Sequence, residues 1–413
     1  MWVKTEQKEE VAAKQHNPAI WPIRFVYMSI YGSNAMYLPF APIFMKTAGL
    51  TEVQIGLIGT VRPFVSFISM PFWGAIADRW SMWAKVLLLG LMFSATCIKL
   101  SLLMCTSFPL IALVLVGGDF LGNPVLSIID STALDAIPDP LAFGRLRLFG
   151  TIGWGTMAPL GGLLLEARGM GVTFITSGAL ALAVMLLITQ LRVTPPKRNA
   201  PPAKGGWRVM FEDPLTILLL LGTLLMGQCY GAIGSFLFVR LQALGAGSVL
   251  MGLTLSMNCL VEAPCFFFAE RAIRALGLVG VMQVCLVLMA ARLFFYSLLV
   301  NPWMVLLVEG IHGVTYSLWF TAGSAHCRRL ATNGNAASLQ GFFNGIKVGV
   351  GAGTGSLIAT AVSSHSSIEA MFSVFALAVL AMAALLTLAQ ASGRLGPRTR
   401  LDEHKGDTES HLL

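Results

Sequence analysis

Ionisable side chains lie inside long apolar stretches of this sequence, where a charge is costly to bury. They are Arg62, Lys99, Asp119, Asp130, Glu262, Arg292, Glu309, His312 and Lys347. On insertion scales a charged residue at the bilayer centre costs at least about 2.5–3.5 kcal/mol, so such residues commonly mark an ion or substrate pathway. These residue types can form ion pairs, bind protons and hydrogen-bond a polar solute.

The second half of the chain carries the richer set. Glu309 and His312 are three residues apart and therefore share one face of a helix. With Glu262, Arg292 and Lys347 they make two acids, two bases and one imidazole, a near balance that indicates mutual pairing. A histidine beside carboxylates can serve as a proton relay. The alternative is a static ion-pair cluster that fixes helix packing, although buried ion pairs often fail to stabilise a protein.

The composition shows what kind of protein must position these groups. Of 413 residues, 56% are hydrophobic and 12% are charged, whereas a soluble domain is roughly 45–50% apolar and about 25% charged. This excludes a soluble enzyme, a nucleic-acid-binding protein and a disordered chain. A run of about 20 apolar residues crosses a bilayer as a helix. We expect twelve such spans, at about 21–46, 54–77, 85–106, 109–137, 144–166, 171–192, 214–240, 248–270, 278–300, 302–327, 335–362 and 367–392.

The distribution of Lys and Arg predicts the orientation of these spans. With the N-terminus inside, the outer loops carry only Lys46, Arg168 and Arg240 of the 28 basic residues. Most of the others fall in inner loops and termini, so the net charge of +8 is mainly a cytoplasmic fringe. We expect a multi-pass protein of the plasma membrane or an endomembrane, with both termini in the cytoplasm.

An internal repeat predicts two halves of six helices each. Gly59 and Pro71 match Gly252 and Pro264 at a shift of 193 residues. Parallel repeats of this kind build transporters whose substrate site lies between the halves, near the bilayer midplane. We expect a cytoplasmic segment at 1–20, a first half at 21–192, a proline-rich cytoplasmic linker at 193–213, a second half at 214–392 and a cytoplasmic tail at 393–413.

Two further spacings fall on helix faces. Asp119 and Asp130 are eleven residues apart, nearly on one face. The repeat alignment places Asp119 opposite His312, so both halves are expected to present a titratable group at one depth. Glycine recurs every four residues from Gly341 to Gly353, which favours close packing of that helix against a neighbour.

No cofactor or metal is expected. The sequence contains no P-loop and no dinucleotide-binding glycine pattern, so ATP-driven transport has no support. The seven cysteines lack metal-type spacing. No pair of residues has the spacing of a catalytic nucleophile and its base, so an enzyme is the least favoured class.

Several motifs resemble the major facilitator superfamily. Gly74-Ala75-Ile76-Ala77-Asp78-Arg79 is similar to its loop signature between the second and third helices, although the usual glycine and basic cluster is degraded at 80–83. Residues 143–154 closely resemble the fifth helix of the lactose-permease-like branch of proton symporters. Residues 262–268 are similar to the group called major facilitator superfamily domain-containing protein 6. The resemblance covers 20–392 and implies an all-α fold of twelve transmembrane helices.

The resemblance also implies roles for residues of the first half. Arg147 matches an arginine that binds sugar hydroxyls, a role that suits the paired donors of a guanidinium. Trp154, seven residues on, matches a tryptophan that stacks on the sugar ring. Asp130 lies one position from the acid that partners this arginine. The expected substrate-binding residues are thus Arg147, Trp154, Asp130 and Asp119, and the expected gating loop carries Asp78 and Arg79.

In the second half, three basic residues match those of the symporter branch: Arg292, His312 and Lys347. Together with Glu262 and Glu309 they form the expected proton-coupling and ion-pair network.

The second half also departs from that branch. Glu309 stands where the family has a lysine, Thr315 where it has a proton-carrying glutamate, and Gly231 and Gly234 where it has two aspartates. The intramembrane charges are therefore arranged differently than in that branch. Our hypothesis is that Glu309 pairs with Lys347, and that Glu262 or Glu309 takes over proton binding.

The leading functional hypothesis is a secondary active transporter of a small polar solute, sugar- or nucleoside-like, driven by proton symport through alternating access. Its expected partners are the solute, protons and the lipid bilayer, with no nucleic acid, and it is expected to act as a monomer. An uncoupled uniporter or exchanger is the alternative that Thr315 favours. A receptor that does not transport is a third class, and the retained intramembrane charges argue against it.

Overall fold

The computed structural model describes residues 20–137, 139–190, 206–246, 248–331 and 335–393. In these ranges the chain is helical and contains no strand, so the predicted all-α membrane fold is confirmed. The helices of the first half are α2 (Ile20–Ala35), α3 (Ala41–Thr47), α4 (Glu52–Arg79), α5 (Ala84–Ser101), α6 (Phe108–Ala136), α7 (Phe143–Arg168) and α8 (Met170–Gln190). Those of the second half are α9 (Pro214–Ala243), α10 (Ser248–Ser297), α11 (Val305–Leu330), α12 (Ala336–Asn344), the π-helix η7 (Gly345–Gly351), α13 (Ala352–His365) and α14 (Ile368–Ala391).

The helix boundaries are consistent with the twelve expected spans, with three local departures. The first span is broken after Ala35 by a short 3₁₀ turn, Leu38–Phe40, because the ring of Pro39 cannot continue an α-helix. Helix α10 joins two spans through Gly277, whose φ of 69° suits glycine. The eleventh span is α12, η7 and α13 in succession. Among the described residues, eight helical segments are long and apolar enough to cross a membrane by length and composition.

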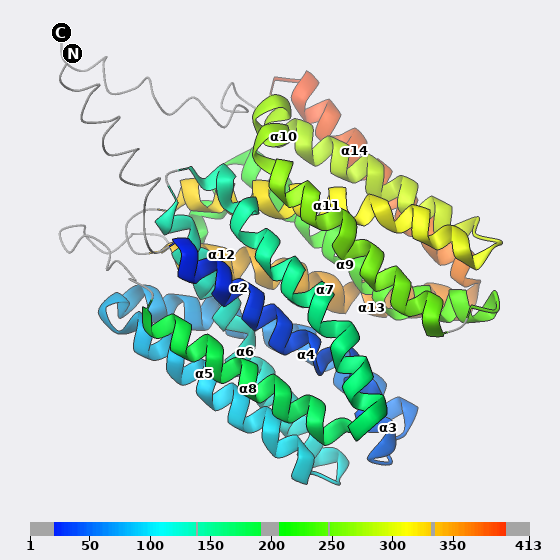
Figure 1. The fold of residues 1–413 in the computed structure, drawn as a ribbon. Helices are drawn as coiled ribbons and strands as arrows, with labels where there is room; N and C mark the ends of the chain where they lie inside the picture. The colour runs from blue at the N-terminus through cyan, green and yellow to red at the C-terminus, as the bar shows by residue number, and fades with distance from the viewer. Residues whose placement is uncertain (1–19, 138, 191–205, 247, 332–334, 394–413) are drawn as a thin grey trace.

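Figure 1 shows the helices of 20–190 and those of 206–393 as two neighbouring bundles. In the first, α2 packs on α7 and α8, and α6 packs on α4 and α5. In the second, α10 packs on α11 and α14, and α9 on α13. The bundles meet where α4 contacts α12 and η7, and where α7 contacts α10. Most of the predicted linker lies outside the described residues, as do nearly all of the N-terminal segment and the tail, but Gly206–Phe211 form a 3₁₀ helix.

The glycine repeat of the eleventh span packs against α4, as expected. A Cβ atom on Gly341 would lie 2.6 Å from the carbonyl oxygen of Met70, and one on Gly349 would lie 2.5 Å from Cβ of Phe67. The two helix backbones therefore touch at these points, and η7 is held at the contact between the bundles.

Candidate functional site

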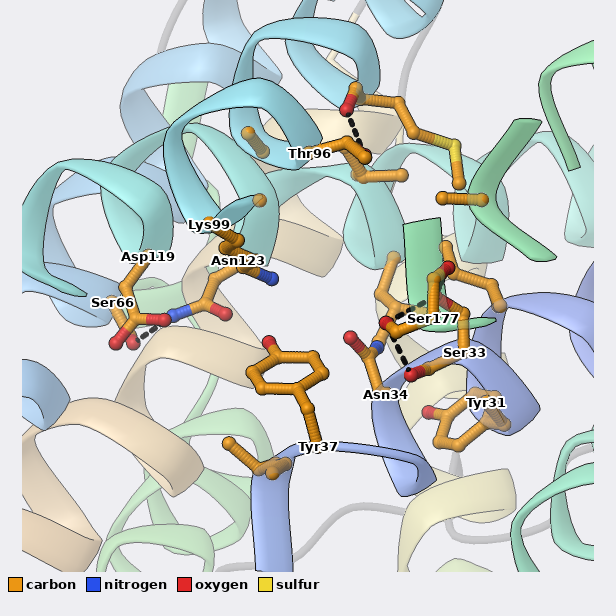
Figure 2. Close-up of a pocket in the computed structure, with 18 of the residues that line it drawn as sticks. Tyr31, Ser33, Asn34, Tyr37, Ser66, Thr96, Lys99, Asp119, Asn123 and Ser177 are labelled. Atoms are coloured by element: carbon orange, nitrogen blue, oxygen red, sulfur yellow. Dashed lines mark hydrogen bonds between the residues drawn. The ribbon is translucent and has the colours of Figure 1, made fainter. Parts of the chain in front are cut away.

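A cavity of about 410 Å³ lies among α2, α4, α5, α6 and α8 (Figure 2). Trp154 of α7 and Val348 of η7 complete its wall, so the cavity reaches the contact between the bundles. Its polar and charged lining includes Ser33, Asn34, Arg62, Ser66, Thr96, Lys99, Asp119, Asn123 and Ser177, and its aromatic lining includes Tyr31, Tyr37 and Phe174. Of the expected substrate-binding residues, the cavity brings Trp154 and Asp119 together.

Two pairs of side chains, spaced one helical turn apart, join α4 to α6 on this wall. Arg62 donates to Asp119 through Nε at 2.5 Å and through a terminal nitrogen at 3.2 Å. One turn along both helices, Asn123 donates to the hydroxyl of Ser66 at 2.6 Å. Both charges of the Arg62–Asp119 pair are thereby balanced within the wall.

Across the cavity, α2 and α8 are joined by a pair of serines. Ser33 donates to the carbonyl of Ser177 at 2.8 Å, and Ser177 donates to the carbonyl of Ser33 at the same distance. Figure 2 shows this pair on the side of the cavity away from Lys99 and Asn123. The cavity thus has hydroxyl groups on one side and charged groups on the other.

Arg147 lies next to the cavity, enclosed by aromatic rings. Its guanidinium carbon is 4.3 Å from the ring centroid of Tyr31, 4.8 Å from that of Phe320 and 5.6 Å from that of Tyr27. The side chain is buried, and its Nε has no hydrogen-bond partner. Because Tyr31 also lines the cavity, one ring separates this cation from the cavity.

Asp130 is bound by neutral donors. Tyr27 donates its hydroxyl at 2.6 Å, and the Asn344 amide, which comes from α12 of the other bundle, donates at 3.3 Å. Among the described residues it forms no ion pair with Arg147, the arginine beside which the resemblance placed it. The two residues are instead linked through Tyr27, which touches both.

In the second bundle, Arg292 gathers a compact buried cluster. Its terminal nitrogens contact Glu309 at 2.8 Å and Nδ1 of His312 at 3.0 Å, and its Nε donates to the hydroxyl of Tyr296 at 2.7 Å. Tyr296 in turn donates to Glu309. The hypothesis that Glu309 pairs with Lys347 is therefore wrong, because Arg292 and the Tyr296 hydroxyl already occupy the two oxygens of this carboxylate.

Lys347 instead lies over aromatic rings. Lys347 belongs to η7, and its Nζ is 4.3 Å from the ring centroid of Tyr316 and 4.4 Å from that of Phe320, both on α11. Phe320 is thus contacted by a cation from each bundle, Arg147 and Lys347. His312 stacks on Tyr316 with ring centroids 5.4 Å apart, so a row of rings connects the Arg292 cluster to the contact between the bundles.

Glu262 lies where α7 meets α10. It accepts a hydrogen bond from Thr151 of α7 at 3.1 Å, and in the described part of the chain it forms no ion pair. It is only partly buried. Thr315, at the position of the family's acid, donates to backbone carbonyls of its own helix.

The sequence did not indicate the aromatic partners of these charges. A signal was nevertheless present, because all six tyrosines lie inside apolar spans, where a phenol hydroxyl needs a polar partner. Tyr27, Tyr31, Tyr296 and Tyr316 all contact one of the charged groups described above.

The expected gating loop ties the two bundles together at one end of the molecule. Asp78, at the end of α4, accepts hydrogen bonds from the backbone amides of Ala337 at 3.1 Å and Ser338 at 2.8 Å, and from the Ser338 hydroxyl. It therefore caps the first turn of α12, where unpaired amides and the helix dipole favour an anion. Arg79 is exposed.

Ion pairs reinforce the same end of the molecule. Asp135 of α6 pairs with Arg328 of α11 at 2.6 Å, and Arg145 of α7 pairs with Glu270 of α10 at 2.9 Å. Each joins the two bundles, so this end is closed in the structure.

We expect Asp78→Asn to weaken this closure, because a neutral amide is a poorer acceptor for the amides of α12. Loss of a helix cap costs about 0.5–2 kcal/mol. Alkylation of a cysteine placed near Ser338 should become faster, and Arg79→Gln is the matched control that should leave it unchanged. Equal rates in both variants would contradict the capping role.

Apolar helices in two bundles that are joined at one end, around a cavity with charged and polar groups in its lining, are the arrangement of a secondary transporter of the membrane. The chain belongs to the MFS_1 like family, whose profile matches residues 20–374. This confirms the predicted membership of the major facilitator superfamily and places the chain among transporters rather than enzymes.

Individual proteins agree with this assignment. The maltose permease of Geobacillus stearothermophilus is 23% identical over 382 residues, which cover 91% of this chain and 96% of that protein. The human major facilitator superfamily domain-containing protein 6-like is 30% identical over 189 residues, covering 46% of this chain but only 32% of its own length. The crystal structure of a point mutant of the nucleoside transporter NupG superposes with a TM-score of 0.67 at 16% identity, covering 90% of this chain and 99% of that one.

Proposed function

We propose that this protein is a proton-coupled symporter of a small polar solute, sugar- or nucleoside-like, that works by alternating access. The observation that carries the proposal is the cavity among the apolar helices, which has charged and polar groups in its lining and whose wall extends through Trp154 and Val348 to the contact between the bundles. A solute bound there touches both bundles, so its binding energy can change the way in which they meet.

The lining supports a polar solute with a ring. A volume of about 410 Å³ lies in the range of small-molecule sites. Ser33, Asn34 and Asn123 offer hydrogen bonds to hydroxyl groups, and the Trp154 ring offers a face on which a sugar or a base can stack. Two of the similar proteins are named as a maltose permease and a nucleoside transporter, which agrees with this choice.

Glu262 is the carboxylate best suited to carry the proton. Glu309 is held by both Arg292 and Tyr296, so protonating it would break a buried ion pair. Glu262 has a single neutral donor, Thr151, and that donor belongs to the other bundle. Gain or loss of its charge therefore acts directly on the contact between the bundles.

We propose that the two bundles are the halves that rock about the cavity. The end closed by Asp78, Asp135 and Arg145 is the cytoplasmic end, in accord with the basic residues gathered there. Both termini then lie in the cytoplasm. We also propose that the protein acts as a monomer in the plasma membrane or an endomembrane.

An uncoupled carrier is the second candidate. It is favoured by Thr315, because a threonine hydroxyl at the position of the family's acid supplies no titratable proton. In that case the solute would equilibrate across the membrane without being concentrated.

Uptake by the purified full chain in proteoliposomes tests the proposal. With an inward proton gradient, labelled sugar or nucleoside should accumulate inside above its external concentration, and a protonophore should abolish the accumulation. Equilibration that ignores the gradient would support the uncoupled carrier. Absence of flux for the whole panel would favour a receptor instead.

A further inference from the structure

One cation in the cavity is not paired with an acid among the described residues. Lys99 of α5 lines the cavity, and in the described part of the chain its ammonium forms neither an ion pair nor a hydrogen bond. Its Nζ lies 5.1 Å from the ring centroid of Tyr37, a contact that compensates only part of the cost of burying a charge. Because the residue is half-buried, water does not fully compensate it either.

The charged side chains that line the cavity leave a surplus at this residue, because they are two cations, Arg62 and Lys99, and one carboxylate, Asp119. The other carboxylates considered above are Asp130, Glu262 and Glu309. Asp119 is taken by Arg62 and Glu309 by Arg292. The two other acids lie at the contact between the bundles, where Tyr27 and Thr151 bind them. The cavity lining is therefore one negative charge short of balance.

The neighbouring helix α6 leaves room for the Lys99 side chain. Lys99 lies along two glycines of α6: a Cβ on Gly118 would be 3.3 Å from its Cγ, and one on Gly122 would be 3.2 Å from its Nζ. The amide of Asn123 follows directly on the same wall and also lines the cavity. Lys99 and Asn123 thus both contribute polar groups to this wall.

We propose that the transported solute is a small organic monoanion whose carboxylate binds Lys99. Its polar body extends toward Ser33 and Ser177 on the opposite side of the cavity (Figure 2). A charge-assisted hydrogen bond is roughly twice as strong as a neutral one, and a bound carboxylate restores the charge balance of the cavity. This inference rests on the proposed function, because it names the solute class of the same cavity.

Matched solutes that differ in one carboxylate test the inference. The pairs are D-glucuronate with D-glucose, and orotidine with uridine. We would measure binding to the purified full chain by calorimetry, and counterflow in proteoliposomes. The carboxylate member of at least one pair should bind about 10- to 100-fold more tightly, as expected for a hydrogen bond to a charged group.

Variants of Lys99 assign the effect to this residue. Lys99→Gln should remove the preference while binding of the neutral member remains, which also shows that the variant is folded. Lys99→Arg keeps the charge and should retain most of the preference. Equal binding of both members of each pair by the unmodified protein would overturn the inference and leave the proposed function standing. If no member of either pair binds or moves, the proposed solute class fails as well.

Discussion

Replacing Glu262 by Gln should abolish gradient-driven accumulation while solute still exchanges across the membrane. In proteoliposomes with an inward proton gradient, we expect the inside-to-outside ratio to fall to about 1, the value at which no coupling free energy is transmitted. Gln keeps the shape of the side chain and its hydrogen bond with Thr151, but it cannot take up a proton. Counterflow, which needs no net proton movement, should persist.

The conservative variant Glu262→Asp is the matched control, because it retains an acid at the contact between the bundles. It should keep measurable accumulation. Binding gives a second readout: solute affinity of the unmodified protein should depend on pH, and that of Glu262→Gln should depend on it much less. Accumulation by Glu262→Gln that equals that of the unmodified protein would eliminate Glu262 as the proton carrier.

Removal of Glu309 should be the most destabilising single change among the charged residues. Arg292 and Glu309 are only 2% and 1% exposed, so Glu309→Leu leaves a buried guanidinium without its anion. Breaking a buried pair in this way costs about 3–5 kcal/mol. We would measure the free energy of unfolding in detergent or lipid, with the amount of folded protein as an independent readout.

Two comparisons separate this effect from a general loss of packing. The double variant Arg292→Met/Glu309→Leu should be more stable than Glu309→Leu alone, because replacing both partners removes the unpaired charge. The pair Arg240–Glu369 is more exposed, at 16% and 39%, so Glu369→Ala should cost no more than about 1 kcal/mol. If Glu309→Leu were as stable as the unmodified protein, the structural role of the Arg292 cluster would be contradicted.

The positions of the helices followed from the chain itself. Apolar runs act locally, so Gly277 lies between two expected spans, whereas the break near Pro39 interrupts the first expected span. The π-helix around Lys347 was not expected. Its wider turn is set by close contacts with α4 and α9, which are tertiary and leave only the glycine spacing as a signal.

The sequence predicted which charged residues the candidate site contains, but it predicted few of the contacts between them. Arg292 and His312 were expected in one cluster and are found there. Arg62 and Lys99 were noted as intramembrane charges, yet nothing in their spacing indicated that they share a cavity with Asp119. Residues far apart in sequence meet only when helices from different parts of the chain are placed side by side.

By itself, the sequence determined that the chain is a membrane protein, where its helices run, and which few charges lie within its apolar runs. These properties depend on composition and on spacing along one helix, which neighbouring helices do not alter. The tertiary structure alone decided the partners: Glu309 with Arg292, Lys347 with aromatic rings, and Lys99 with the Tyr37 ring but no acid in the described chain. The physical reason is that a small rotation of one helix exchanges the neighbours of every side chain on it, so pairing is a property of the packed bundle.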